Sequence, residues 1–250
     1  MAPNVPLRLT LIGGFALRRG REELRIAASG QRLIALLALK SRPAGRIHVA
    51  GTLWPDHSTD RSLGDLRTTL WRIRRSCDRV VGASPSNLWL EGHIEVDVRD
   101  LVAFARRLSR PETAPGAADL DSVPFASLVD DLLPDWYDDW LLDEREELRQ
   151  TRLHALESLA RQLNACGRHA DAIQAALAAV RLEPLRETAH YTLIEIHLAE
   201  GNRSEACRQF ERCRRMLRDE LGVEPADSMR RLLAHGPRRS SSPAPSPALD

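Results

Sequence analysis

The apolar residues of the first 100 positions alternate with polar ones, then follow a helical period, then alternate again. In "LRLTLIGGFALRRG", Leu7, Leu9 and Leu11 fall on one side of an extended chain, and the alternation resumes at Phe15 after a glycine pair. A return segment, "ELRI", follows Gly20. Alternation broken by glycines is typical of short paired strands, so this part of the chain predicts a small antiparallel sheet.

Three segments with a helical period come next. The first, "QRLIALLALKS", is stopped by Pro43, and the second, within "IHVAGTLWPD", ends before Pro55. The third covers residues 61–79, "RSLGDLRTTLWRIRRSCDR". Its apolar residues lie on one narrow face, namely Leu63, Leu66, Leu70, Ile73 and Cys77. We therefore expect a third helix that packs its leucine face on the first two.

Alternation returns in "NLWLEGHIEVDV", where the apolar residues flank a Glu91-Gly92 turn. This pattern predicts a β-hairpin. A sheet, three helices and a hairpin in this order predict a winged helix with an extra N-terminal sheet. A winged helix places its third helix in the DNA major groove and extends its hairpin toward the adjacent backbone or minor groove.

The second half of the chain is helical and contains a repeat. "CGRHADAI" matches "EGNRSEAC" at an offset of 34 residues, with Gly167 aligned to Gly201 and Ala172 to Ala206. This is the tetratricopeptide period, and flanking helices near 141–164 and 225–234 are needed to complete the core. We expect an α+β winged-helix DNA-binding domain at 1–100, an all-α tetratricopeptide-like domain at 101–235 with a loop near 110–124, and a disordered tail at 236–250.

Charge separates the two halves of the chain. Residues 1–100 carry 16 Lys and Arg against 10 Asp and Glu, a net charge of +6, whereas residues 101–250 carry 20 against 25, a net charge of −5. A basic half favours a polyanionic partner, with chance segregation as the alternative. Arginine can bind phosphate or guanine, and a threonine methyl can contact thymine. The candidate DNA-binding residues are Arg61, Arg67, Thr68, Trp71, Arg72, Arg74, Arg75 and His93.

Trp71 is the unusual residue of the third helix, because it lies among the arginines rather than among the leucines. Two interpretations stay open from the sequence. Its ring can lie against a sugar or a thymine methyl, or it can pack beneath the hairpin without touching DNA. His93, beside the predicted turn, can reach a phosphate.

Other classes of protein find little support in the sequence. No apolar run approaches the roughly 18 residues of a membrane span, and the N-terminus lacks the pattern of a secretion signal. The four cysteines form no CxxC pair, which indicates reduced, buried thiols in a cytoplasmic protein. Neither a phosphate loop, an HExxH or GxSxG motif, nor a Cys/His cluster at metal spacing is present, so we expect no enzyme, cofactor or metal. Within the acidic run 130–147, we expect the aromatic side chains to seal the start of the helical domain and the carboxylates to face water.

Several segments together resemble a known family. "GQRLIALLALKSRP", "LWPD" and "LRTTLWRIRR" are similar to the OmpR/PhoB-type winged helix of SARP-type (antibiotic regulatory protein) activators. "DDWLLDEREELR", "GRHADAI", "EPLRETAHYTLI" and "ELGVEP" are similar to the bacterial transcriptional activator domain. The resemblance covers about residues 7–235.

The resemblance implies a sequence-specific activator that binds direct repeats in double-stranded DNA near a promoter, as a homodimer of side-by-side protomers, and recruits RNA polymerase through its sigma or alpha subunit. It also implies control of a secondary-metabolite or other pathway-specific gene cluster. The family's recognition positions fall on Arg67, Thr68, Trp71, Arg72 and Arg74. Its polymerase-contacting segment falls on residues 55–61, with candidates Asp56, His57, Ser58 and Asp60.

Two departures from the family pattern matter. Relatives usually carry a smaller or polar residue at the position of Trp71, so their base preference does not transfer. This sequence also contains no GxxxxGK(S/T) motif, so it resembles the small members of the family rather than the larger relatives that carry an ATPase module. The alternative function is a tetratricopeptide-type adaptor that binds protein but not DNA, which the basic first half argues against.

Overall fold

The computed structural model describes residues 6–108 and 125–235, and these form two compact units. The described parts of 1–107 and 123–152 make the first, N-terminal unit, and those of 153–250, with Leu108, make the second, helical unit. The predicted loop at 110–124 and the predicted tail at 236–250 both lie wholly outside the described residues. The combination of an α+β region and an all-α region confirms the predicted fold class.

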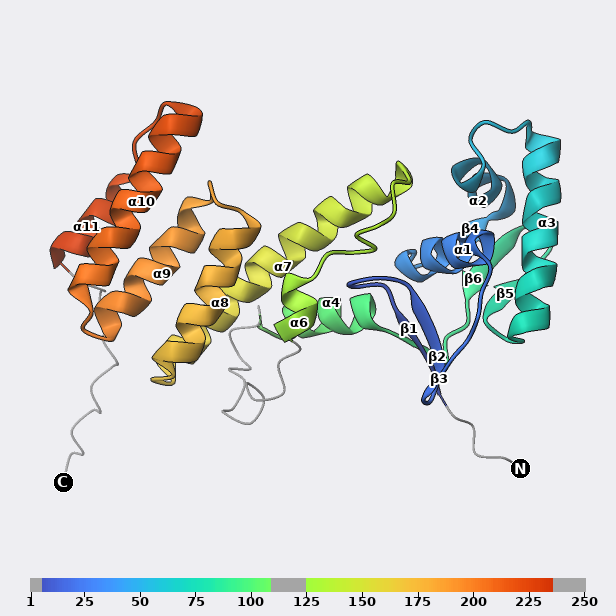
Figure 1. Ribbon diagram of the computed structural model, residues 1–250, viewed down its shortest axis with the longest axis horizontal. Coiled ribbons are helices and arrows are strands. Elements are labelled where there is room, and N and C mark those ends of the chain that lie inside the picture. The colour runs from blue at the N-terminus through green and yellow to red at the C-terminus, as the bar shows by residue number, and fades with distance from the viewer. Residues whose placement is uncertain (1–5, 109–124, 236–250) are drawn as a thin grey trace, which may run out of the picture. The chain divides into compact units, whose positions relative to one another are not determined.

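The N-terminal sheet is built as the alternation predicts, with one added strand (Figure 1). Its strands are β1 (Leu7–Thr10), β2 (Ala16–Arg19), β3 (Glu22–Glu23) and β7 (Ile94–Val96), in the order β3-β2-β1-β7. The first three are antiparallel, and β7 runs parallel to β1. Leu7, Leu9 and Leu17 are buried, so one face of this sheet belongs to the core.

The three expected helices follow in order (Figure 1). They are α1 (Ala28–Leu39), α2 (Arg46–Leu53) and α3 (Thr59–Ser76). A second sheet accompanies them, with β4 (Ala44–Gly45), β6 (Asn87–Leu90) and β5 (Val81–Ala83) in that spatial order. The α1 helix supplies an almost continuous buried surface from Leu33 to Ala38, against which α3 and β6 pack.

The predicted hairpin about Glu91-Gly92 is wrong. The β6 strand pairs with β5, not with β7, so the hairpin turns at residues 84–86 instead. Residues 94–96 leave for the other sheet, where Ile94 pairs with Leu7 and Val96 with Leu9. Alternation reports which residues of a strand face the core but not which strand lies beside it, and both arrangements bury Ile94 and Val96.

The chain after β7 adds further elements to the N-terminal unit. They are most of α4 (Asp97–Leu108), α6 (Phe125–Val129) and the first part of α7 (Trp140–Ala165). Residues 131–133 lie beside the end of β1, where the amide of Gly13 donates to the carbonyl of Asp131 at 2.7 Å and that of Leu133 to Leu11 at 2.9 Å. The buried Asp97 carboxylate accepts hydrogen bonds from the amides of Leu11 and Ile12. This unit therefore depends on residues well beyond position 100.

The helical unit shows the predicted repeat. Its helices are the rest of α7, α8 (His169–Leu182), α9 (Glu187–Ala199), α10 (Arg203–Leu221) and α11 (Asp227–His235). The starts of α8 and α10 are 34 residues apart, as are the ends of α7 and α9. Gly167 and Gly201 occupy equivalent turns with φ of +74° and +86°, a conformation that other residues rarely adopt.

The core of the helical unit contains a buried polar cluster around His190. His190 is fully buried, its Nε2 lies 2.8 Å from the carbonyl oxygen of Pro184, and its Nδ1 lies 2.7 Å from Nε2 of Gln209. Burial lowers the pKa of His190, which keeps the ring neutral. Nε2–H then donates to Pro184 and Nδ1 accepts from Gln209. Cys213 is also buried, but Cys166 and Cys207 are exposed, so the prediction that the cysteines are buried is wrong for these two.

Candidate nucleic-acid interface

The α3 helix is formed and oriented by its own sequence. Asp60 lies in its first turn and Arg74 and Arg75 in its last, which suits the helix dipole at both ends. Its inner face buries Ser62, Leu66, Thr69, Leu70 and Ile73, while Leu63 is half-buried. Each fully buried leucine or isoleucine contributes about 1.5–3 kcal/mol. The apolar stripe therefore fixes which side of the helix faces outward.

The outward side of α3 carries the predicted arginines. All the predicted α3 residues are exposed, namely Arg61, Arg67, Thr68, Trp71, Arg72, Arg74 and Arg75. Within the part of the chain that the structure describes, no acidic side chain forms an ion pair with any of these five arginines. Gly64 lies on the same helix, and a Cβ there would meet only the guanidinium of Arg67, at 3.8 Å. The arrangement presents several uncompensated cations on one surface, which suits a polyanion.

Trp71 belongs to this outward surface. It is 57% exposed, and the guanidinium carbon of Arg75 lies 4.9 Å from the ring centroid. A cation over an indole face is attracted by its quadrupole, so Trp71 restricts where Arg75 points. The exposure rules out the interpretation in which Trp71 packs beneath the hairpin. Contact with DNA stays a prediction.

A different tryptophan supports the hairpin. Trp89 of β6 is paired with Gly82 of β5, and a Cβ on Gly82 would fall 2.1 Å from the indole nitrogen of Trp89. The indole therefore lies directly on the glycine backbone. At the turn, the amide of Arg46 donates to Ser86 and its Nε donates to Ser84, both at 2.9 Å. This contact joins the hairpin to the start of α2.

His93 does not lie on this hairpin. It falls in the turn between β6 and β7, where the amide of Ile94 donates to the carbonyl of Glu91 at 3.2 Å. The ring is exposed, and the structure does not bring it to the hairpin turn at 84–86. Its role in DNA binding stays a prediction.

The loop before α3 holds the candidate polymerase contacts. Asp56, Ser58 and Asp60 are exposed, and His57 is held by a 2.8 Å contact between its Nδ1 and the Asp65 carboxylate. The loop borders a hollow of about 540 Å³. The other walls of this hollow include Arg32 of α1 and residues 137–140 at the start of α7. A shaped surface thus lies beside the N-terminus of the outward helix.

The start of α7 is attached to α1 by ion pairs that the sequence did not indicate. Asp138 pairs with Arg32, and Glu144 with Lys40 at 2.7 Å. The expectation that the acids of 130–147 face water is therefore wrong for these two. Trp136 stacks on Phe15, as expected if the aromatics of this run are packed against the protein. Tyr137 does not follow this expectation, because it is 90% exposed.

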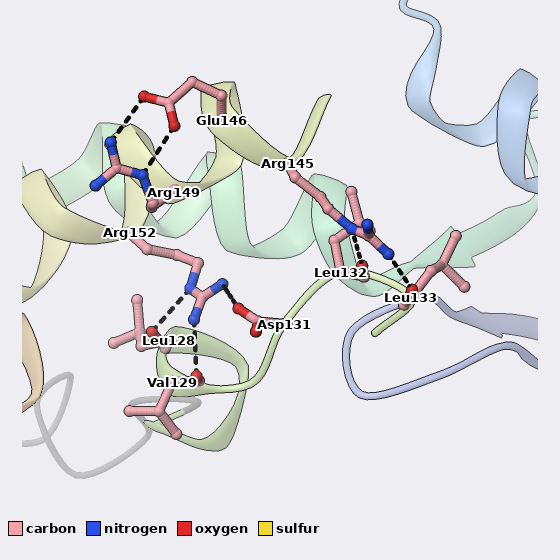
Figure 2. A network of polar contacts seen from close by, with 9 residues as sticks. All are labelled: Leu128, Val129, Asp131, Leu132, Leu133, Arg145, Glu146, Arg149 and Arg152. Carbon is pink, nitrogen blue, oxygen red and sulfur yellow. Dashed lines mark hydrogen bonds and ion pairs between the residues drawn. The ribbon is translucent and has the colours of Figure 1, made fainter. Parts of the chain in front are cut away.

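Two arginines of α7 brace the segment that precedes it (Figure 2). Arg152, almost fully buried, donates to the carbonyls of Leu128 at 3.0 Å and Val129 at 2.7 Å, and lies 3.3 Å from the Asp131 carboxylate. Arg145 lies on the same face of α7, seven residues earlier, and donates to the carbonyl of Leu132 at 2.9 Å.

Figure 2 also shows the contact of Arg145 with Leu133, and Leu133 has a φ of 45°, in the left-handed region. Sequence reasoning missed both arginines. The available signal was their spacing of seven, which places them on one side of the helix.

Residues 6–108 and 125–235 contain neither a metal-binding cluster nor a membrane-spanning helix. No group of three or more His, Cys, Asp or Glu side chains there is placed to hold a metal ion. None of the helices in those ranges has the length and apolar character needed to cross a membrane.

Comparison with known proteins places this geometry in a family. The family model described as the bacterial transcriptional activator domain matches residues 97–235, more than half of the chain. The chain belongs to the bacterial transcriptional activator domain family. Its resemblance to SARP-type regulators is confirmed by its relatives. The regulatory protein AfsR of Streptomyces coelicolor is 28% identical over 236 residues, and the regulatory protein DnrI of Streptomyces peucetius is 27% identical over 251 residues.

The extent of these matches differs. The match covers 90% of this chain and 90% of DnrI, but the chain spans only about a quarter of AfsR, 24% of its length. Among solved structures, EmbR of Mycobacterium tuberculosis, in complex with a low-affinity phosphopeptide, superposes with a TM-score of 0.75 at 20% identity. That match covers 92% of this chain and 64% of the EmbR chain, and it supports the fold. The match to the bacterial transcriptional activator domain begins at Asp97. The carboxylate of this residue accepts a hydrogen bond from the Leu11 amide, just after β1. The matched domain therefore follows directly on the winged-helix region.

Proposed function

We propose that this member of the bacterial transcriptional activator domain family is a sequence-specific DNA-binding activator of transcription. The observation that carries the proposal is the outward face of α3, where five exposed arginines have no acidic partner among the described residues. The position of α3 after two helices and before a hairpin supports its entry into the major groove. Arg67, Thr68, Trp71, Arg72 and Arg74 make the base and backbone contacts in this proposal.

The proposal assigns two protomers side by side on direct repeats near a promoter, as a homodimer on DNA. The α2–α3 loop then contacts the sigma or alpha subunit of RNA polymerase through Asp56, His57, Ser58 and Asp60. The hollow beside this loop supports the assignment, because it offers a shaped surface next to the DNA-contacting helix. A protein with this function works in the cytoplasm, catalyses no reaction and needs no cofactor. The regulated genes form a pathway-specific cluster, such as one for a secondary metabolite.

Selection of bound duplexes from a random library, followed by a salt titration, tests the proposal. A protein that neutralises several phosphates loses affinity steeply as salt rises. We expect Arg72→Ala to cost about 1–3 kcal/mol at the selected site if Arg72 contacts a base, or to reduce the salt slope by about 1 if it contacts a phosphate. Arg8→Ala removes an exposed arginine that faces Glu95 on the N-terminal sheet, and it serves as the matched control.

Trp71 gives the test a second readout. Because Arg75 lies over its ring, Trp71→Ala frees Arg75 as well as removing the indole, and it is expected to relax the selected sequence. If Trp71→Ala selects the same site with unchanged stringency, Trp71 does not contribute to sequence recognition. Unchanged footprints in both Arg67→Ala and Arg72→Ala would refute the assignment of α3. A chain that binds no DNA at low salt would instead be an adaptor.

A further inference from the structure

A groove of about 680 Å³ runs over the helical unit between α8, α9 and α10. Three half-buried or buried apolar residues form part of its lining, namely Ile173, Leu177 and Leu193. Arg208, Arg212 and Arg215 of α10 also line it, and their spacing of four and three residues places them on one helical face. The groove thus combines an apolar surface with a row of guanidinium groups.

The acidic residues of the groove do not neutralise this row. Glu205 pairs with Arg208 within α10, and hydrogen bonds from Arg208 lower the pKa of Glu205. Glu211 pairs with Arg214, at 2.8 Å. Arg212 and Arg215 are exposed and form no ion pair with any described residue. Two cations therefore remain available beside the apolar lining.

His197 adds an unmet hydrogen-bonding group. Its side chain is only 13% exposed, lines the groove, and its Nδ1 is buried without a hydrogen-bond partner among the described residues. The nearest carboxylate oxygen, on Glu200, lies 3.9 Å away, beyond hydrogen-bond distance. A buried nitrogen without a partner costs free energy, so the groove side of α9 is not optimised for the unbound state alone.

From these observations, we infer that the groove binds an acidic peptide segment of a partner protein, with apolar side chains on the lining and carboxylates on Arg212 and Arg215. An arginine binds a carboxylate through two parallel N–H donors, which a small apolar ligand cannot use. The volume fits several side chains, and the apolar lining distinguishes this surface from one built for a phosphate backbone. This inference goes beyond the proposed function, because DNA binding by α3 neither uses nor requires the groove.

The test uses the full chain and a phage-displayed library of random dodecapeptides. Selection on the wild-type protein is compared with selection on Arg212→Gln/Arg215→Gln, which changes two exposed side chains. The matched control is Arg218→Gln/Arg230→Gln, which removes the same charge outside the groove lining. Circular dichroism confirms that all three proteins are folded. We expect peptides rich in Asp, Glu and large apolar residues, and at least about tenfold weaker binding to the groove variant only.

Alkylation of cysteine locates the bound peptide. Cys207 lines the groove and is exposed, and the equally exposed Cys166 lies outside its lining, so the chain carries its own reference thiol. A selected peptide at ten times its Kd should slow alkylation of Cys207 roughly tenfold, since only the free fraction reacts, and should leave Cys166 unchanged.

Failure to enrich any peptide, enrichment of peptides without acidic residues, equal loss of binding in both variants, or an unprotected Cys207 would each overturn the inference. DNA binding is measured separately, so the proposed function stands or falls on its own test.

Discussion

Replacing Arg152 by methionine tests whether the arginine brace holds the N-terminal unit together. In the native protein the Arg152 side chain is 3% exposed and donates to the carbonyls of Leu128 and Val129. Methionine has a similar length and fills the same space without any N–H donor. The substitution therefore removes the hydrogen bonds while creating little cavity.

The expected cost can be worked out from the burial of each partner. Leu128 is fully buried, and a buried carbonyl without a donor costs about 1–3 kcal/mol. Val129 is 39% exposed, so water replaces part of its lost bond, and we assign it about 0.5–1 kcal/mol. The Asp131 side chain is 71% exposed and loses an ion pair that contributes about 0–1 kcal/mol. The sum is about 1.5–5 kcal/mol.

Thermal unfolding measured by circular dichroism checks this value. At roughly 3 °C per kcal/mol for a unit of this size, Tm should fall by about 5 °C or more. Hydrogen exchange should also accelerate at the amide of Gly13, which donates to Asp131, and at that of Leu133, which donates to Leu11. Arg18→Met, which removes an exposed arginine paired with Glu23 at 3.3 Å, is the control. Equal Tm values for Arg152→Met and Arg18→Met would refute the reasoning.

Three further predictions concern other parts of the chain. Burial lowers the pKa of His190, so the unfolded chain takes up the proton more readily and the helical unit should lose stability as pH falls below about 6.5; urea unfolding should show this, with a flatter dependence in His190→Asn. Gly82→Ala should destabilise the N-terminal unit by about 1–3 kcal/mol in thermal melts, because its Cβ would overlap Trp89, whereas Gly51→Ala has open space and should not. Cys213 should resist alkylation in the native protein, since burial raises its pKa to about 11, and rapid labelling measured by mass spectrometry would contradict the structure.

Much of the fold could be predicted because its elements are encoded locally. The period of the leucines identified α1, α2 and α3, and the leucine stripe of α3 correctly placed its arginines on the outer surface. The offset of 34 residues identified the helical repeat. Each of these signals depends on residues within a few turns of each other, which is where sequence patterns are informative.

What could not be predicted depends on contacts between distant segments. The pairing of Ile94 with Leu7 spans most of the N-terminal unit, and nothing local to "NLWLEGHIEVDV" distinguishes it from a hairpin. The ion pair between Lys40 and Glu144 could likewise not be predicted from the sequence, because every carboxylate is an equal candidate to pair with the only lysine. For the candidate site, the helical period placed Trp71 on the outward face of α3 but left open whether it packs beneath the hairpin. Its exposure and its contact with Arg75 emerge only from the folded structure.

The parallel pairing of β1 with β7 has a consequence for the order in which the protein is made. A ribosome releases the N-terminal end first, yet Leu7 must wait for Ile94, and the end of β1 must wait for residues 131–133. Along the sequence, helices α1 to α3 thus lie between β1 and β7, two strands that pair in the same sheet. Closing such long loops slows folding, because the chain entropy is lost before the contacts are gained. The α3 helix should consequently be synthesised well before the unit that carries it can finish folding.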